Sequence, residues 1–342
     1  MYCTQIIKGL TIILVLQWVY YSSWGQDVHF TQFFNSPLSL NPANTGNFDG
    51  RFRFATNNRN QWGSISAPFI TSSFSLDSRF LKRKTGRDHA GVGLYVFQYM
   101  SGDVNLNNTE VMLSSSFIKV LDRKGQSKLS FGLQGGFFQR SIDLSKLKFA
   151  DQYDYDAGDY TQATGEVISG FKVTKADFQA GITYLHNNPE KLLINSGLSF
   201  FHLTEPDASF IGTIDRIPLR SVAHSDVLVK ITDKDYIGPQ LLFMYMKRAS
   251  EFTFGGIYKH VMDTESDIVI SFGSYYRFQD ALLLISEIEY DNWKVGISYD
   301  INVSRLHVAS NHRGGFEISI IYIDKWLSGK DRTPFVVPCY RF

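Results

Sequence analysis

The residues in this sequence that are most able to do chemistry are four acids that lie close together with three tyrosines among and after them. The stretch DQYDYDAGDY, Asp151 to Tyr160, carries four carboxylates. Clustered carboxylate oxygens are the ligands that Ca²⁺ prefers. The spacing does not match an EF-hand loop, which needs alternating ligands, a central glycine and a distal glutamate. The pattern therefore favours a solvated acidic loop over Asp151–Asp159, with calcium binding as the alternative.

The other candidate groups do not form a recognisable site. Gly91-Val92-Gly93 lacks the third glycine and the following helix of a dinucleotide site. The eight histidines include no HExxH pair, and Ser271 and Ser286 do not lie in a GxSxG motif. We therefore predict no catalytic residue, no bound cofactor, no metal ligand and no enzymatic activity.

The first 25 residues have the pattern of a secretory signal peptide. Lys8 precedes an apolar stretch, Leu10 to Tyr21, and Ser23 and Gly25 are small residues suited to cleavage before Gln26. The apolar stretch is shorter than the roughly 20 residues that span a bilayer as a helix. We therefore expect an exported chain that begins near Gln26. Its one remaining cysteine, Cys339, then has no partner for a disulfide.

The rest of the chain is dominated by alternation of apolar and polar residues with a period of two. Val92, Leu94 and Val96 show it in one segment, and about fourteen such segments follow one another, many around ten residues long. That length suits a tilted strand that crosses the hydrocarbon layer. The formal net charge is +1 without a basic stripe, so nucleic acid is not an expected partner.

The lengths of the connections distinguish a membrane barrel from a soluble β-sandwich, which is the alternative. Three long connections, Ser141–Val173, Thr204–Pro218 and Asn302–Arg313, all fall on the same side of the strand order, and the other side has mostly tight turns. Outer-membrane barrels show this asymmetry, with short periplasmic turns and long external loops. We therefore predict an all-β, transmembrane antiparallel barrel of about 14 strands, an even number. Both termini would be periplasmic and the long loops extracellular.

The alternation also predicts which side chains face the lumen and which face lipid. Lumen-facing residues are expected to be polar, and aromatic residues near strand ends are expected to form girdles at the membrane interfaces. For the lumen we predict Gln98, Gln134, Ser196, His224 and Asp226; for lipid Tyr99, Leu133, Val227 and Phe272; for the girdles Tyr245, Tyr258, Tyr275, Tyr290 and Trp293.

A long ordered motif at the start of the exported chain carries a resemblance to a known family. FTQFFNSPLSLNPANTG, residues 30–46, and RFRFATNNRNQW, residues 51–62, resemble the opening of the PorP/SprF family of type IX secretion system membrane proteins, as do KLKFADQYD, DFQAGITYLHNN, GGFEISIIY and the terminal CYRF further on. Asp-Val-His at residues 27–29 and Tyr340 depart from the usual family pattern. The residues that match the motif are Gln32, Phe33, Asn35, Pro37, Leu38, Leu40, Asn41, Pro42, Ala43, Gly46, Arg59, Asn60, Gln61 and Trp62.

The resemblance implies an integral outer-membrane component of the type IX protein secretion machinery, with gliding motility served in some members. The partners that it implies are periplasmic ring or peptidoglycan-linking proteins and a secreted surface protein. The terminal aromatic Phe342 is a candidate signal for the barrel-assembly machinery. A docking or anchoring subunit is the favoured function, and a passive channel or transporter of hydrophobic solutes is the alternative.

The motif segment itself, residues 26–49, is expected to be irregular and to precede a barrel over residues 50–342. Its prolines fix φ and withhold N–H groups, and its asparagines satisfy local backbone groups. Irregular backbone at membrane depth is tolerated only inside protein or a polar lumen. We therefore predict that the segment packs in the periplasmic mouth with Phe33, Phe34 and Leu40 against the wall, and that residues 59–62 fold inward from the first external loop. An exposed periplasmic tether is the alternative.

Overall fold

The computed structural model describes residues 27–63, 67–82, 88–102, 105–165, 170–188, 190–210, 214–263 and 268–324. The predicted signal peptide and Phe342 lie outside these residues. Among the described residues, no helix combines the length and the apolar character that a membrane-spanning helix requires.

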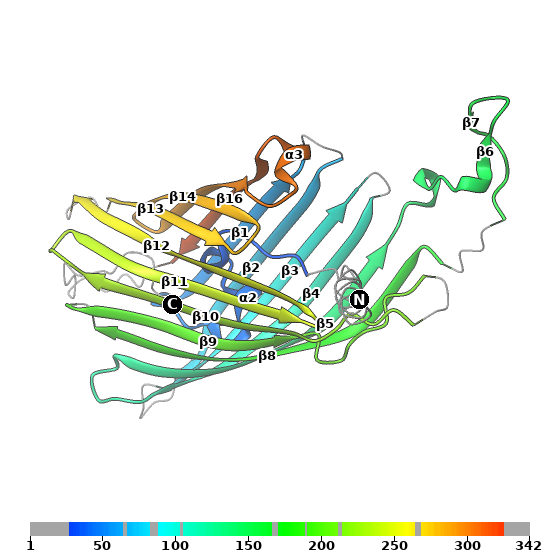
Figure 1. The fold of residues 1–342 in the computed structure, drawn as a ribbon. Helices are drawn as coiled ribbons and strands as arrows, with labels where there is room; N and C mark the ends of the chain where they lie inside the picture. Colours follow the sequence, from blue (N-terminus) through cyan, green and yellow to red (C-terminus); the bar gives the residue numbers. More distant parts are fainter. Residues whose placement is uncertain are drawn as a thin grey trace, which may run out of the picture.

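Fourteen antiparallel strands close into a barrel, as the alternation predicted. Each strand pairs with its neighbour in the sequence, and the first strand, β1, pairs with the last, β16 (Figure 1). The strands are β1 (Phe52–Gln61), β2 (Phe69–Lys82), β3 (His89–Ser101), β4 (Leu106–Val120), β5 (Ser127–Ser141), β8 (Lys172–Asn188), β9 (Leu192–Phe201), β10 (Arg220–Lys230), β11 (Asp235–Met246), β12 (Ala249–Asp263), β13 (Ile268–Arg277), β14 (Ala281–Tyr290), β15 (Trp293–Asn302) and β16 (Arg313–Ile323).

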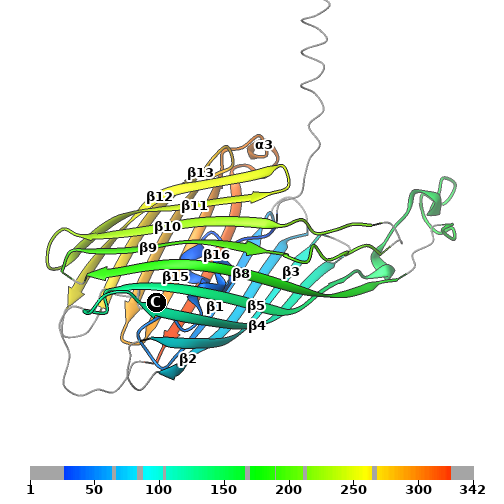
Figure 2. The ribbon, with the colours of Figure 1, turned by 90° about the horizontal axis from the view of Figure 1, so that it is seen from below.

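The connections are sorted by length as expected. The long ones, β5–β8, β9–β10 and β15–β16, lie at one end of the barrel, which we call the long-loop end, and the opposite end is the short-turn end. The β5–β8 connection contains η3 (Leu144–Lys146), η4 (Ala150–Gln152) and a small hairpin of β6 (Tyr153–Asp154) and β7 (Asp159–Tyr160). This hairpin projects away from the strands as an arm (Figures 1 and 2). The β15–β16 connection holds the short helix α3 (His307–Ser310).

The outer face of the barrel is apolar, as a lipid-facing surface requires. Leu113, Leu133, Phe137 and Phe272 are each more than half exposed on it. The predicted girdle residues Tyr245, Tyr258, Tyr290 and Trp293 are also exposed. Since lipid covers this face in a membrane, the exposure causes no hydrophobic penalty there.

Four of the predicted orientations are wrong. Tyr99, predicted to face lipid, lies on the same side of β3 as Tyr95 and Phe97 and packs against the buried cluster that contains them. Gln98 and Ser196 lie on the outward-facing positions of their strands, while Phe97 and Asn195 beside them are buried. Tyr275 is 2% exposed and points into the barrel, where its hydroxyl donates to the Gln240 side chain. Gln134, His224 and Asp226 are buried, as predicted. The reason for the exceptions is that the interior of this barrel is filled and partly apolar.

Candidate functional site

The lumen is filled by the N-terminal segment, residues 27–49, which we call the plug. It consists of three short helical turns: η1 (Phe33–Asn35), α2 (Pro37–Leu40) and η2 (Pro42–Asn44). Pro37 and Pro42 each stand at the first position of a turn, where a missing N–H costs nothing. The Asn41 side chain caps the third turn by accepting from the Ala43 N–H at 2.9 Å. The prolines and asparagines of the motif thus produce a compact path that needs no partner strand.

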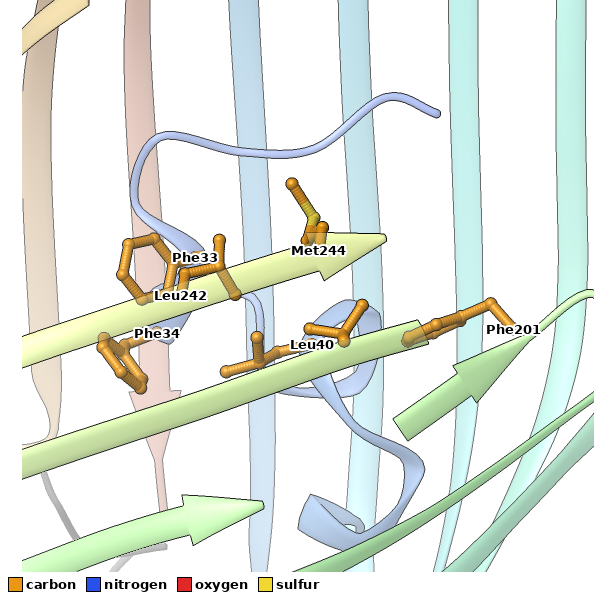
Figure 3. Close-up of a cluster of buried hydrophobic side chains, with 7 residues drawn as sticks. Phe33, Phe34, Leu40, Phe201, Leu242 and Met244 are labelled. Carbon is orange, nitrogen blue, oxygen red and sulfur yellow. The ribbon is translucent and has the colours of Figure 1, made fainter. Parts of the chain in front are cut away.

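Apolar plug residues pack on the wall in two clusters. Phe33, Phe34 and Leu40 contact Phe201, Val222, Leu242 and Met244 of β9 to β11 (Figure 3). On the other side of the lumen, Phe30 and Leu38 pack with Tyr95, Phe97 and Met112 of β3 and β4. The predicted anchoring of Phe33, Phe34 and Leu40 against the wall is confirmed. These contacts replace water by close-packed side chains inside the barrel.

Glycines in the wall leave room for the plug backbone. A Cβ on Gly132 would overlap the backbone of Pro42 and Ala43, and a Cβ on Gly181 would overlap the Asn41 side chain. Where these glycines lie, the Asn41 amide donates to the carbonyls of Ile182 and Leu198 at 3.1 Å each. Any larger residue at these wall positions would force the plug to shift.

Polar plug groups bind carboxylates of the last strands. The Thr31 and Gln32 N–H groups donate to the Glu317 carboxylate at 2.7 and 3.1 Å. The Asn35 amide donates to Glu287 at 2.7 Å. Because buried donors and acceptors that lack partners are costly, these bonds fix the rotation of the plug about its own axis.

A buried ion pair holds the plug near the short-turn end. Arg53 of β1 donates to Asp77 of β2 through two nitrogens, at 3.0 and 2.9 Å, and both side chains are at most 1% exposed. Each partner also binds the plug: Arg53 donates to the Asn44 carbonyl at 3.0 Å, and Asp77 accepts from the Gly46 N–H at 2.7 Å. The pair is thus satisfied in part by the plug backbone.

A second charged cluster holds the first residues of the plug at the long-loop end. His202, just after β9, lies 3.2 Å from the Asp27 carboxylate and 2.7 Å from that of Asp177, and Arg220 lies 2.9 Å from Asp27. Burial opposes a charge on His202, but the two carboxylates outweigh it and raise its pKa to about 10. Burial likewise opposes ionisation of Asp27, yet Arg220 and His202 hold the pKa of Asp27 below its usual range. The plug therefore spans the lumen from this end to Asp49, and the prediction that it sits in the short-turn mouth is corrected to this longer path.

Arg59 is a strand residue, so the prediction that it belongs to the first external loop is wrong. Arg59, Asn60 and Gln61 complete β1, and Trp62 follows it and packs edge-on against Phe69. The Arg59 side chain is 2% exposed and donates to Asp300 and to the His29 carbonyl, each at 2.6 Å. Because the Arg59 side chain reaches the plug from the barrel wall, the contact forms without any inward folding of the first external loop.

Every strand of the barrel contacts the plug through at least one inward side chain or carbonyl. From β1 to β16 these are Arg53, Asp77, Tyr95, Ser116, Gln134, Ile182, Ser199, His224, Leu242, Glu251, Arg277, Glu287, Asp300 and Glu317. Cavities of about 30 and 10 Å³ remain beside the plug. They have room for a few water molecules. Both of these cavities, which described residues line, are too small for a protein or a drug-sized solute.

Ten of the fourteen motif residues lie in the plug, inside the barrel; of the other four, Arg59 is buried, Asn60 is exposed, and Gln61 and Trp62 are half-buried. Gln32, Phe33, Asn35, Pro37, Leu38, Leu40, Asn41, Pro42, Ala43 and Gly46 are all buried. They cannot contact a partner protein directly while the plug is seated. The sequence reasoning did not identify the wall residues that receive them, such as Asp77, Glu317 and Gly132. Isolated acids and glycines within alternating strands were the available signal.

The acidic loop forms turns that use its own carboxylates. Asp154 accepts from the N–H groups of Asp156 and Ala157, and Asp151 accepts from Thr164 and from the Gly165 N–H at 2.7 Å. These bonds lower the pKa of both Asp151 and Asp154. Across the described ranges there is no cluster of three or more potential metal-ligating side chains.

The antiparallel strands form a closed barrel with an even number of strands and an apolar outer face, and the plug fills its lumen. These features define a plugged outer-membrane β-barrel protein. Residues 22–322 match the family described as type IX secretion system membrane protein PorP/SprF. The chain belongs to this family and is thus a membrane component of that secretion system. A comparison with curated proteins found no match.

Among solved structures, the toluene transporter TbuX of Ralstonia pickettii is similar in fold. It is 10% identical with a TM-score of 0.50, over 85% of this chain and 93% of TbuX. The toluene transporter TodX of Pseudomonas putida is also 10% identical, with a TM-score of 0.49 over 86% of this chain and 94% of TodX. At this identity the likeness shows the fold alone.

Proposed function

We propose that this protein is a non-enzymatic docking or anchoring subunit of the type IX secretion machinery, which works with its lumen closed. The observation that supports this most is the plug, which contacts all fourteen strands and has water-sized cavities beside it among the described residues. Even without the plug, a barrel of fourteen strands is too narrow for a folded cargo protein. Cargo proteins would then cross the membrane by another route.

The contact surfaces in this proposal are the exposed ends of the barrel, because the ten motif residues of the plug are buried. The long-loop end carries the arm (Figure 1), on which Tyr155 is 90% exposed, and Phe171, directly before β8, is 59% exposed. In the orientation usual for such barrels, this end is extracellular and the short turns and termini are periplasmic. The extracellular end would contact a secreted surface protein, and the periplasmic end would contact ring or peptidoglycan-linking proteins.

Affinity purification from the native outer membrane in mild detergent, followed by mass spectrometry, tests the docking function. The wild-type chain is compared with a variant in which residues 150–165, which include the arm, are replaced by a short Gly-Ser linker, and with a control variant, Glu190→Gln, in the tight β8–β9 turn. We expect type IX components and one surface protein with the wild type, and loss of the surface protein with the arm variant only.

Conductance in planar bilayers separates this function from the alternative. A closed docking subunit gives no steady conductance as purified. Recovery of the barrel alone, together with a stable conductance that toluene or another small aromatic solute reduces, would support a channel or transporter of hydrophobic solutes and refute the docking proposal.

A further inference from the structure

The seam between the first and last strands is lined on its lumen side by residues that face each other across it. Arg59 pairs with Glu317, Asn57 with Ser319 and Ala55 with Ile321 in the register of β1 and β16. Their side chains point inward, and all but one are at most 2% exposed. The seam is therefore a place where the plug can hold both strands at once.

The plug lies along this seam at two places. Near the long-loop half, the Thr31 and Gln32 N–H groups bind Glu317, and the Asn35 amide donates to Ser319 at 3.1 Å. Near the short-turn end, Phe48 is fully buried in a cluster with Ala55, Ile321 and Ile323. Plug contacts thus cover the seam over most of its length.

These contacts join residues that are very far apart in the sequence. Thr31 and Glu317 are 286 positions apart, so their contact closes a loop that contains the whole barrel. The plug ends at Asp49, next to β1, which begins at Phe52. Once β16 is bound to the plug, it is already beside β1, and the entropic cost of bringing the ends together has been met. Pairing of β16 with β1 then adds only local contacts.

We propose that the plug is an intramolecular template for barrel closure: residues 31–35 and Phe48 bind β16 and bring it into register with β1. The recognised partner is this chain's own last strand, and its recognition groups are Glu317, Ser319, Ile321 and Ile323. In this order of events the plug is seated as the seam forms, and it does not enter a barrel that is already closed. The proposal is independent of the docking function.

The test compares plug residues on the seam with plug residues on the wall. The seam variants are Asn35→Ala and Phe48→Ala. The matched wall variants are Thr45→Val, which loses its bond with Ser114 of β4, and Leu38→Ala, which leaves the cluster on β3 and β4. All four residues are buried plug residues. Each chain also carries Cys3→Ser and Cys339→Ser, so that no natural thiol remains.

Closure is followed during refolding from urea into phospholipid vesicles. Cysteines introduced by Asn58→Cys and Ile318→Cys, which are direct partners across the seam, form a disulfide when the strands pair. Unfolding rates are measured separately on the same chains without these two cysteines. A template predicts that the seam variants slow disulfide formation about tenfold, whereas the wall variants change it less than about twofold and mainly speed unfolding.

The proposal is overturned if all four variants slow closure equally, or if none slows closure and all speed unfolding, because the plug would then dock after the barrel has closed. If Phe48→Ala gives no folded protein, Phe48→Leu takes its place and the same comparison with Leu38→Ala decides. Failure of a seam variant to close at all, while both wall variants close normally, supports the template.

Discussion

Removal of the Asp77 carboxylate is a direct measure of how strongly the plug is held. The Asp77→Ala change leaves the buried Arg53 guanidinium without its counter-ion and the Gly46 N–H without its acceptor. Breaking a buried ion pair from one side costs about 3–5 kcal/mol, and an unsatisfied buried donor adds about 1–3 kcal/mol. We therefore expect a loss of about 4 kcal/mol or more in the free energy of unfolding.

A double-mutant cycle separates the ion pair from the packing. Arg53→Met keeps an apolar side chain near the Phe48 ring, over which the Arg53 guanidinium lies at 4.8 Å. In the double variant no charge is left unpaired, so its loss should be at least about 2 kcal/mol smaller than the sum of the two single losses. The assay is urea unfolding in vesicles, followed by tryptophan fluorescence. A loss below about 1 kcal/mol for Asp77→Ala, or strict additivity in the cycle, would refute the reasoning.

Three further predictions concern the wall, the middle of the plug and the end of the plug that holds Asp27. Gly132→Ala should destabilise the barrel by about 1–3 kcal/mol, because its Cβ meets plug backbone, whereas Gly135→Ala on the outer face of the same strand meets only a side chain and should cost less in the same urea assay. Asn41→Asp keeps the shape of the side chain but loses the N–H donors to two strand carbonyls, so we expect a loss of about 2 kcal/mol or more by urea unfolding, and an unchanged midpoint would contradict it. Because the pKa of His202 is raised from 6.5 to about 10 in the folded chain, its stabilising contribution is complete below pH 6.5 and is lost as the pH rises toward 10. Asp27, whose folded pKa is lowered, contributes above pH 3.8 and loses its contribution on acidification. A pH series of unfolding free energies should therefore fall on the alkaline side for the wild type and be flatter there for His202→Gln.

The strands and their order could be predicted because lipid imposes a simple rule on one face. Every second residue of such a strand meets hydrocarbon and must be apolar there. Examples are Val92, Leu94 and Val96 in one strand and Leu129, Phe131 and Leu133 in another. In this up-and-down barrel the three long connections lie at one end, although tight turns such as that of residues 247–248 between β11 and β12 occur at that end too. Both signals are local in the sequence, so the closed antiparallel barrel and its fourteen strands were predicted correctly.

Which side chains point inward and which point outward was less predictable, because a partly apolar plug reduces the difference in polarity between lumen-facing and lipid-facing residues. A water-filled lumen would require polar inward residues, but Tyr95, Leu242 and Tyr275 point inward onto a partly apolar plug or beside it. Alternation then shows two faces without showing which is inside. Partners such as Thr31 and Glu317 are separated by 286 positions, and nothing local to either residue encodes that contact.

The central claim is that the protein works with its lumen closed, and a disulfide between plug and wall tests it most directly. The Ser36 and Ser73 hydroxyls are buried and 3.3 Å apart, so Ser36→Cys with Ser73→Cys, in a Cys339→Ser background, can tie the plug to β2. Secretion of type IX cargo is then measured in cells with the bond oxidised and after reduction. A closed docking subunit predicts full secretion in both states, with either single cysteine as the control. Secretion that stops in the oxidised state and returns on reduction would show that the plug must move, and would contradict the account.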